Sequence, residues 1–278
     1  MPPTGPSKRK RLAHLVMYIA GLLGVALTIA LVLHEGAGDI LGILGMAGWS
    51  LFWLVPLHFL PIGFDVIGWR RLLRGERLAV FPFLLWVAAI RESVNGLLPV
   101  ARVGGELVGV RLLSRRGISG YVAGASIMVE ITLTLVSQFL FTLVGLGIMA
   151  HYVRDNAAIA GVLLGLLITL PGIVVFVLLQ RHWGFFQLLE RLMKVVLGGR
   201  NPLAGVGDMA RLDEKIRDIY RRRWNLGVSL FWQSVGLFMG AVEVWFTFVL
   251  LHHPVSPWVA VLLESLGQAL RSASFMVP

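Results

Sequence analysis

Cysteine is absent from the 278 residues, and charged side chains make up only 14% of them. Without cysteine there are no disulfides, no thiolate metal sites and no cysteine nucleophile. A soluble domain usually carries about 25% charged residues. Because this chain is 57% hydrophobic, it has too little polar side chain to cover a soluble core. The composition therefore excludes an ordinary soluble enzyme and indicates an integral membrane protein.

Acidic residues are also scarce, with 15 Asp and Glu against 25 Lys and Arg, for a net charge of +10. The connecting segments carry +13 and the apolar stretches −3. The basic segments lie between apolar stretches rather than on one domain, which argues against nucleic-acid binding. By the positive-inside rule they lie in the cytoplasm together with the N-terminus; they are residues 8–11, 70–77, 102–116 and 181–223. The neutral or acidic segments are 34–39, 151–156 and 252–257.

Apolar stretches of bilayer-spanning length predict an all-α, polytopic bundle. A disordered basic N-terminus covers residues 1–13. Residues 14–33 are too long for a signal peptide, and no small-residue cleavage site follows them. The predicted spans are residues 14–33, 40–69, 121–150, 157–180 and 225–251. The interval 181–223 is expected to be an amphipathic cytoplasmic elbow, with binding to anionic lipid as the alternative.

Two further apolar stretches are expected to enter the membrane and turn back. Residues 80–100 lie between two basic segments, so they should return to the side from which they entered. Their end, residues 91–99, matches residues 270–278 at Ser93 with Ser272 and at Pro99 with Pro278. We therefore predict a second re-entrant segment at 255–278 and two inverted repeats, 14–150 and 151–278. A crossing helix remains the alternative for both segments.

The second predicted repeat stops where the first continues through residues 100–150. This mismatch predicts that the chain is a fragment, truncated at its C-terminus.

Ionisable side chains within membrane segments are expensive and mark candidate functional sites. Here they fall on three stripes at helical spacing. We expect these stripes to line one polar cavity that suits a zwitterionic or charged lipid headgroup. Buried ion pairs such as Glu92–Arg271 or Glu130–Arg102 are the alternative, purely structural interpretation. The stripes consist of Arg91, Glu92, Asn95 and Pro99; Glu130, Thr134, Ser137 and Gln138; and Glu264, Gln268 and Arg271. Glu243 is a weaker candidate, because its predicted helix contains few other polar residues.

The segment after Pro99 adds Arg102, Gly105 and Glu106 to the candidate site. The pair Gly104-Gly105 permits close approach of a ligand or of backbone, and Arg102 could clamp a phosphate. The pattern matches neither a Walker A loop nor a dinucleotide fingerprint. A simple cytoplasmic turn is the alternative.

The sequence contains few arrangements of residues that are typical of catalytic sites. The seven histidines lie mostly at span ends, where placement at the interface explains them, and His252-His253 has no neighbouring carboxylates. Ser93 and Ser272 lack a base partner other than Glu92. We therefore expect no catalytic residues, no metal and no cofactor.

The chain resembles the membrane domain of lysylphosphatidylglycerol synthase. The resemblance rests on the run 92–113 followed by Arg116-Gly117. Residues 64–70 and 268–272 fit the branch associated with bacterial hopanoid biosynthesis. The family's Asn, Pro and Gly-Glu motif maps onto Asn95, Pro99, Gly105 and Glu106. Family members continue past residue 278 with a Gly- and Glu-containing stretch, which agrees with a truncated chain.

The resemblance implies a flippase-like lipid translocase or lipid-export component of the bacterial inner membrane. Its lipid would be a hopanoid, an aminoacylated lipid or another phospholipid. The soluble aminoacyl-transferase domain is absent from this sequence, so synthesis of lysyl-lipid is not expected. A non-catalytic scaffold of a hopanoid-biosynthesis complex and an intramembrane lipid-modifying enzyme remain alternatives. The expected partners are membrane lipids, a second copy of the chain or lipid-biosynthesis proteins.

Overall fold

The computed structural model describes residues 47–97, 103–152, 156–183 and 209–274, with four isolated residues before them. The predicted span 14–33 and the disordered start 1–13 lie outside the described residues, apart from Leu33. The chain divides into two compact units, Met1–Leu51 and Phe52–Pro278. The helices described below belong to the second unit, apart from the first four residues of η1.

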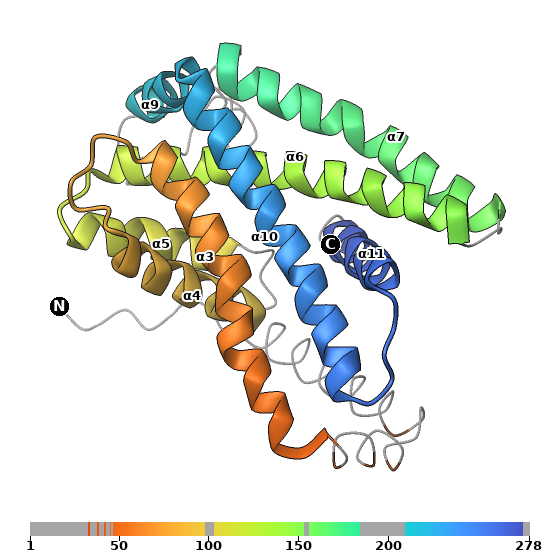
Figure 1. Ribbon diagram of the computed structural model, residues 1–278. Coiled ribbons are helices and arrows are strands. Elements are labelled where there is room, and N and C mark those ends of the chain that lie inside the picture. The colour runs from red at the N-terminus through yellow and green to blue at the C-terminus, as the bar shows by residue number, and fades with distance from the viewer. Residues whose placement is uncertain are drawn as a thin grey trace, which may run out of the picture. The chain divides into compact units, whose positions relative to one another are not determined.

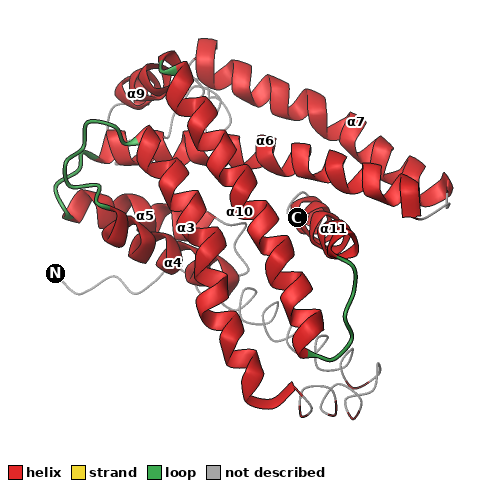
Figure 2. Cartoon of the chain, viewed as in Figure 1, coloured by secondary structure: helices red, strands yellow, loops and turns green. Residues whose placement is uncertain are grey.

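The described part of the chain is helical and contains no strand, which confirms the predicted all-α membrane bundle (Figure 2). Its elements are η1 (Gly48–Trp53), α3 (Leu54–Leu72), α4 (Phe81–Leu97), α5 (Val103–Arg115), α6 (Gly120–Tyr152), α7 (Asn156–Leu178), η2 (Leu179–Trp183), α9 (Met209–Arg221), α10 (Arg223–Leu250) and α11 (Pro257–Ser274). Within the described residues, four segments are long and apolar enough to cross a membrane: Gly48–Leu72, Gly120–Tyr152, Ile159–His182 and Arg223–Leu250.

The two segments expected to be re-entrant correspond to α4 and α11. Neither is among the candidate spans found within the described residues. α4 has 17 residues and α11 has 18, against the roughly 20 apolar residues that a crossing helix needs. The re-entrant path and the inverted repeats stay predictions.

One expectation is corrected by the structure. Residues 102–116 were treated as a basic connection, whereas Val103–Arg115 forms helix α5, which packs on α4 and α6. Two adjacent glycines lower the intrinsic helix propensity of this segment. Packing against α4 overrides that preference, as the contacts of Gly105 show below.

α10 lies along α3, and α11 lies across α6 and α10 (Figure 1). These helices approach closely at small residues, as is typical within membranes. A Cβ at Gly68 of α3 would lie 2.9 Å from the carbonyl oxygen of Ser229 on α10. A Cβ at Gly145 of α6 would lie 2.6 Å from Cβ of Ser265 on α11. Side chains with less than 2% exposure fill the core between α3, α4, α6 and α9, including Trp69, Leu84, Val129 and Ile216.

α9 packs against α6. Its apolar residues Met209, Ile216 and Ile219 are buried there. Its Tyr220 hydroxyl donates a hydrogen bond to Oε1 of Gln180, at 3.0 Å, in η2. Burial raises the pKa of Tyr220, so the hydroxyl stays protonated as a donor. These contacts favour the structural elbow over a helix lying free on lipid.

The Gly145–Ser265 contact yields a testable expectation. Gly145→Ala should destabilise the protein by about 1–3 kcal/mol, because Ser265 lies too close for its side chain alone to give way. Gly147→Ala is the matched control, since nothing lies within 4 Å of a Cβ at Gly147. Thermal unfolding in detergent should show a lower Tm for the first variant and an equal or higher Tm for the second. Equal Tm values would contradict the close contact.

Candidate functional site

A buried ion cluster joins α4, α5 and α6. Nη1 of Arg91 donates to Oε2 of Glu130 at 2.8 Å, and Nη2 donates to Oε2 of Glu106. The side chains are 9%, 12% and 19% exposed for Arg91, Glu130 and Glu106 respectively. One arginine therefore bridges two carboxylates, and the three formal charges sum to −1.

The ion cluster is fixed in place by further contacts. The Gly105 N–H donates to Oδ1 of Asn95 at 2.8 Å, and Nδ2 of Asn95 donates to Oε1 of Glu106 at 3.3 Å. A Cβ at Gly105 would lie 2.7 Å from Cγ of Asn95, so only glycine fits. The guanidinium of Arg91 lies 4.9 Å from the ring centroid of Trp69, a cation–π contact. Nε of Arg91 is buried without a hydrogen-bond partner.

A second polar cluster joins α3, α4 and α10 through a histidine. Nδ1 of His58 lies 3.1 Å from both carboxylate oxygens of Glu243, and Nε2 lies 3.5 Å from Oε1 of Glu92. His58 and Glu92 are about half exposed, and the Glu243 side chain is 24% exposed. Both imidazole nitrogens thus face a carboxylate.

A third polar cluster joins α6 and α11. Nε2 of Gln138 donates to Oε1 of Gln268 at 3.3 Å, and Nε2 of Gln268 donates to Oε1 of Glu264 at 2.8 Å. Glu264 lies beside Gly240 of α10, where a Cβ would be 3.4 Å from Oε1. These contacts bring two of the predicted stripes into direct contact.

Between the first and third clusters, Thr134 of α6 donates its hydroxyl hydrogen bond to the Glu130 carbonyl of its own helix at 3.0 Å, and its Oγ1 also lies 3.5 Å from Oε1 of Gln233 on α10. Gln233 is 2% exposed and its Nε2 has no partner. Oγ of Ser137, one turn further along α6, is also buried without a partner. Asp65 of α3 lies against Gly236 of α10. A row of polar groups thus runs through the apolar bundle.

We use the name polar path for Glu130, Thr134 and Gln138 of α6 together with their partners on other helices. The three residues are spaced four apart and lie on one face of α6. Each contacts a different helix: Glu130 bonds Arg91 of α4, Oγ1 of Thr134 lies 3.5 Å from Oε1 of Gln233 of α10, and Gln138 bonds Gln268 of α11. Eight residues of α-helix extend about 12 Å.

The structure brings together most of the residues expected at the site. Arg91, Asn95, Gly105, Glu106 and Glu130 form the first cluster, and Gln138, Glu264 and Gln268 form the third. Glu92 differs, because it pairs with His58 and not with the group around Asn95. Pro99 and Arg102 lie outside the described residues, as does the side chain of Arg271. A shared headgroup cavity stays a prediction.

Sequence reasoning missed four residues that contribute to these clusters: His58, Asp65, Trp69 and Gln233. His58 was assigned to an interface, but it lies within α3 and contacts carboxylates on two other helices. This contact also gives Glu243, the weaker candidate, a polar partner on another helix. The sequence did contain a sign of this polar face, since His58 and Asp65 are seven residues apart and therefore share one face of a helix.

Candidate metal ligands do not gather in the part of the chain that the structure describes. No group of three or more His, Asp or Glu side chains there is arranged to hold a metal ion. Ser93 donates its hydroxyl hydrogen bond to the Ala89 carbonyl of its own helix at 2.8 Å, rather than to Glu92. The polar side chains lie between helices, where they can bind a polar ligand or let it move through the bundle.

Comparison with known proteins supports a lipid-handling membrane domain. No curated protein and no solved structure matches the chain. The sequence model of the family described as the lysylphosphatidylglycerol synthase TM region matches residues 17–278, and this match covers the clusters described above. The chain is therefore a multi-pass membrane protein that belongs to the lysylphosphatidylglycerol synthase TM region family.

Proposed function

We propose that this protein moves lipid headgroups between the two leaflets of the bacterial inner membrane, with its N-terminus in the cytoplasm. The observation that carries the proposal is the polar path, in which one stripe of α6 contacts α4, α10 and α11 in turn. Its length of about 12 Å is a substantial part of the roughly 30 Å hydrocarbon core.

The bond lengths along the polar path suit exchange of partners. The amide and hydroxyl contacts are long, 3.3 Å between Gln138 and Gln268 and 3.5 Å between Thr134 and Gln233. Neutral hydrogen bonds of this kind contribute little within membranes, about 0.6 kcal/mol on average. A headgroup can therefore replace them at low cost, whereas the Arg91 ion pairs hold the helices together.

The charges favour a headgroup that carries an amine, because the cluster around Arg91 has a net charge of −1. Glu106, Glu130 and Glu264 can receive an amine, and Nε of Arg91, which has no partner among the described residues, can donate to a phosphate oxygen of the same headgroup. A zwitterionic or aminoacylated phospholipid fits this set of charges, and its acyl chains would stay in the bilayer. A hopanoid with a polar side chain is a second substrate, suggested by the sequence resemblance. We propose no catalytic step.

Leaflet exchange in proteoliposomes tests this proposal. The double variant Gln138→Leu/Gln268→Leu removes the amide pair without adding charge. We expect it to slow exchange of a fluorescent phosphatidylethanolamine about tenfold, which corresponds to about 1.4 kcal/mol in the barrier. The assay follows quenching of outer-leaflet fluorescence by dithionite.

Thr169→Val is the control, because the Thr169 hydroxyl on α7 donates to Gly165 of its own helix at 2.7 Å. It should exchange lipid at the wild-type rate. A double variant as fast as wild type would contradict the role of the polar path. Wild-type vesicles no faster than protein-free vesicles would contradict translocation itself and favour a scaffold.

A further inference from the structure

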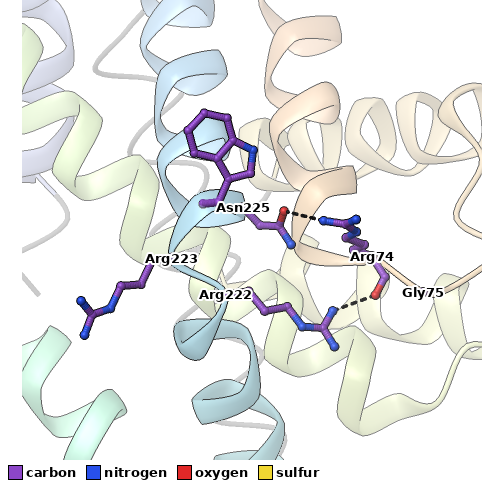
Figure 3. A pocket seen from close by; sticks show the side chains of 6 residues that line it. Arg74, Gly75, Arg222, Arg223 and Asn225 are labelled. Atoms are coloured by element: carbon purple, nitrogen blue, oxygen red, sulfur yellow. Dashed lines mark hydrogen bonds between the residues drawn. The ribbon is translucent and has the colours of Figure 1, made fainter.

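A pocket of about 500 Å³ lies where the segment after α3 meets the start of α10 (Figure 3). Half of its lining residues are arginines and none is acidic; they are Arg74, Gly75, Arg222, Arg223, Trp224 and Asn225. We call this site the arginine pocket. It shares no residue with the polar path.

The arginines of this pocket make hydrogen bonds only to neutral groups among the described residues. Nη1 of Arg222 donates to the Arg74 carbonyl oxygen at 2.9 Å, and Nη1 of Arg74 donates to Oδ1 of Asn225 at 3.5 Å. Figure 3 shows the side chains of Arg74 and Arg222 on the same side of the junction, whereas Arg223 extends away from them. No described carboxylate pairs with any of the three. With respect to the described residues, most of their N–H donors and all of their charge are therefore available to an anion.

The ends of the candidate spans predict that the pocket lies at the level of the membrane surface. One candidate span ends at Leu72, two residues before Arg74, and another begins at Arg223. Trp224 is 80% exposed, and tryptophan is enriched at the membrane–water boundary. The basic segments 70–77 and 181–223 predict that this boundary is the cytoplasmic one.

An apolar surface continues from the pocket into the membrane. Phe231 lies seven residues after Trp224 on α10 and is 60% exposed. A spacing of seven places both rings on one face of the helix, about two turns apart. Lipid chains can lie along this face while the charged head stays at the arginines.

We propose that the arginine pocket binds the phosphate of an anionic phospholipid, such as phosphatidylglycerol, from the leaflet beside it. Arginine suits this ligand because its planar guanidinium donates two parallel hydrogen bonds to phosphate oxygens. Arg74 and Arg222 make these contacts, Arg223 adds long-range attraction, and the chains lie against Trp224 and Phe231. This site anchors lipid whether or not the polar path transports it. A soluble phosphate compound has the same headgroup chemistry but would not use the aromatic face.

Thermal unfolding of the purified full chain in non-ionic detergent tests the proposal. Added phosphatidylglycerol should raise the Tm of the wild type by about 5 °C more than phosphatidylcholine does. The double variant Arg74→Gln/Arg222→Gln should lose this difference. The matched control Arg77→Gln/Arg221→Gln removes two charges from the same two segments outside the pocket and should keep it.

Several results would overturn the proposal. These are a full phosphatidylglycerol effect in the pocket variant, an equal loss in the control, or the same Tm increase with glycerol 3-phosphate. Chemical modification of the wild type by an arginine-specific glyoxal covers the case in which the pocket variant does not fold. Phosphatidylglycerol should protect Arg74 and Arg222 at least fivefold more than Arg77 and Arg221, as read by mass spectrometry. Equal protection of the two pairs would also overturn the proposal.

Discussion

Arg91→Leu is expected to destabilise the protein by about 3–5 kcal/mol and to abolish lipid exchange. Arg91 bridges Glu106 and Glu130, and its removal leaves two buried carboxylates without a counter-charge. α4 would then lose its ion pairs to α5 and α6. Denaturant unfolding in detergent and leaflet exchange in vesicles measure the two effects.

A compensated variant separates stability from function. Arg91→Leu/Glu106→Gln/Glu130→Gln removes all three charges together, so most of the lost stability should return. Exchange should stay lost, because the charged end of the polar path is gone. If Arg91→Leu alone costs less than about 1 kcal/mol, the ion cluster is not the link between these helices that the geometry indicates.

Gly105→Ala is expected to lower stability by about 1–3 kcal/mol and to separate α5 from α4. Its Cβ would overlap the Arg91 carbonyl oxygen and would lie 2.5 Å from Oδ1 of Asn95. Because the first obstacle is backbone, no change of side-chain rotamer relieves the overlap. The Gly105–Asn95 hydrogen bond and the position of Glu106 would change with it. Thermal unfolding measures the loss.

Gly96→Ala is the natural control for this substitution. No atom of the described residues lies within 4 Å of a Cβ at Gly96, which is also within a helix. Alanine there should raise stability by up to about 1 kcal/mol, because it has the higher helix propensity. Similar destabilisation by both substitutions would show that these glycines are needed for something other than close packing.

The sequence predicted the helical class and the approximate limits of the described spans, because apolar length decides both in a membrane protein. The predicted span 121–150 corresponds to α6 (Gly120–Tyr152), and 225–251 corresponds to α10 (Arg223–Leu250). The polar stripe of α6 was also visible, since residues at helical spacing share a face. None of these inferences requires knowledge of which helices are neighbours.

The partners of the polar residues could not be predicted in the same way. Glu130 bonds Arg91, 39 residues earlier, and His58 contacts Glu243, 185 residues later. Spacing along the chain says nothing about contacts between helices. Helix α5 was missed for a related reason: its two adjacent glycines disfavour a helix locally, yet close packing on α4 requires one of them. Tertiary contacts decided both cases.

Water access to the polar path tests the account most directly, and the absence of cysteine makes the experiment simple. Single cysteines at Thr134 and Gln138 would be compared with cysteines at Leu140 and Leu143, which are 44% and 41% exposed on the same helix. In proteoliposomes, a membrane-impermeant thiol reagent should label the first pair at least tenfold faster. Added substrate lipid should slow that labelling. If all four positions react equally slowly, the polar groups are not open to water and do not form a route for lipid headgroups.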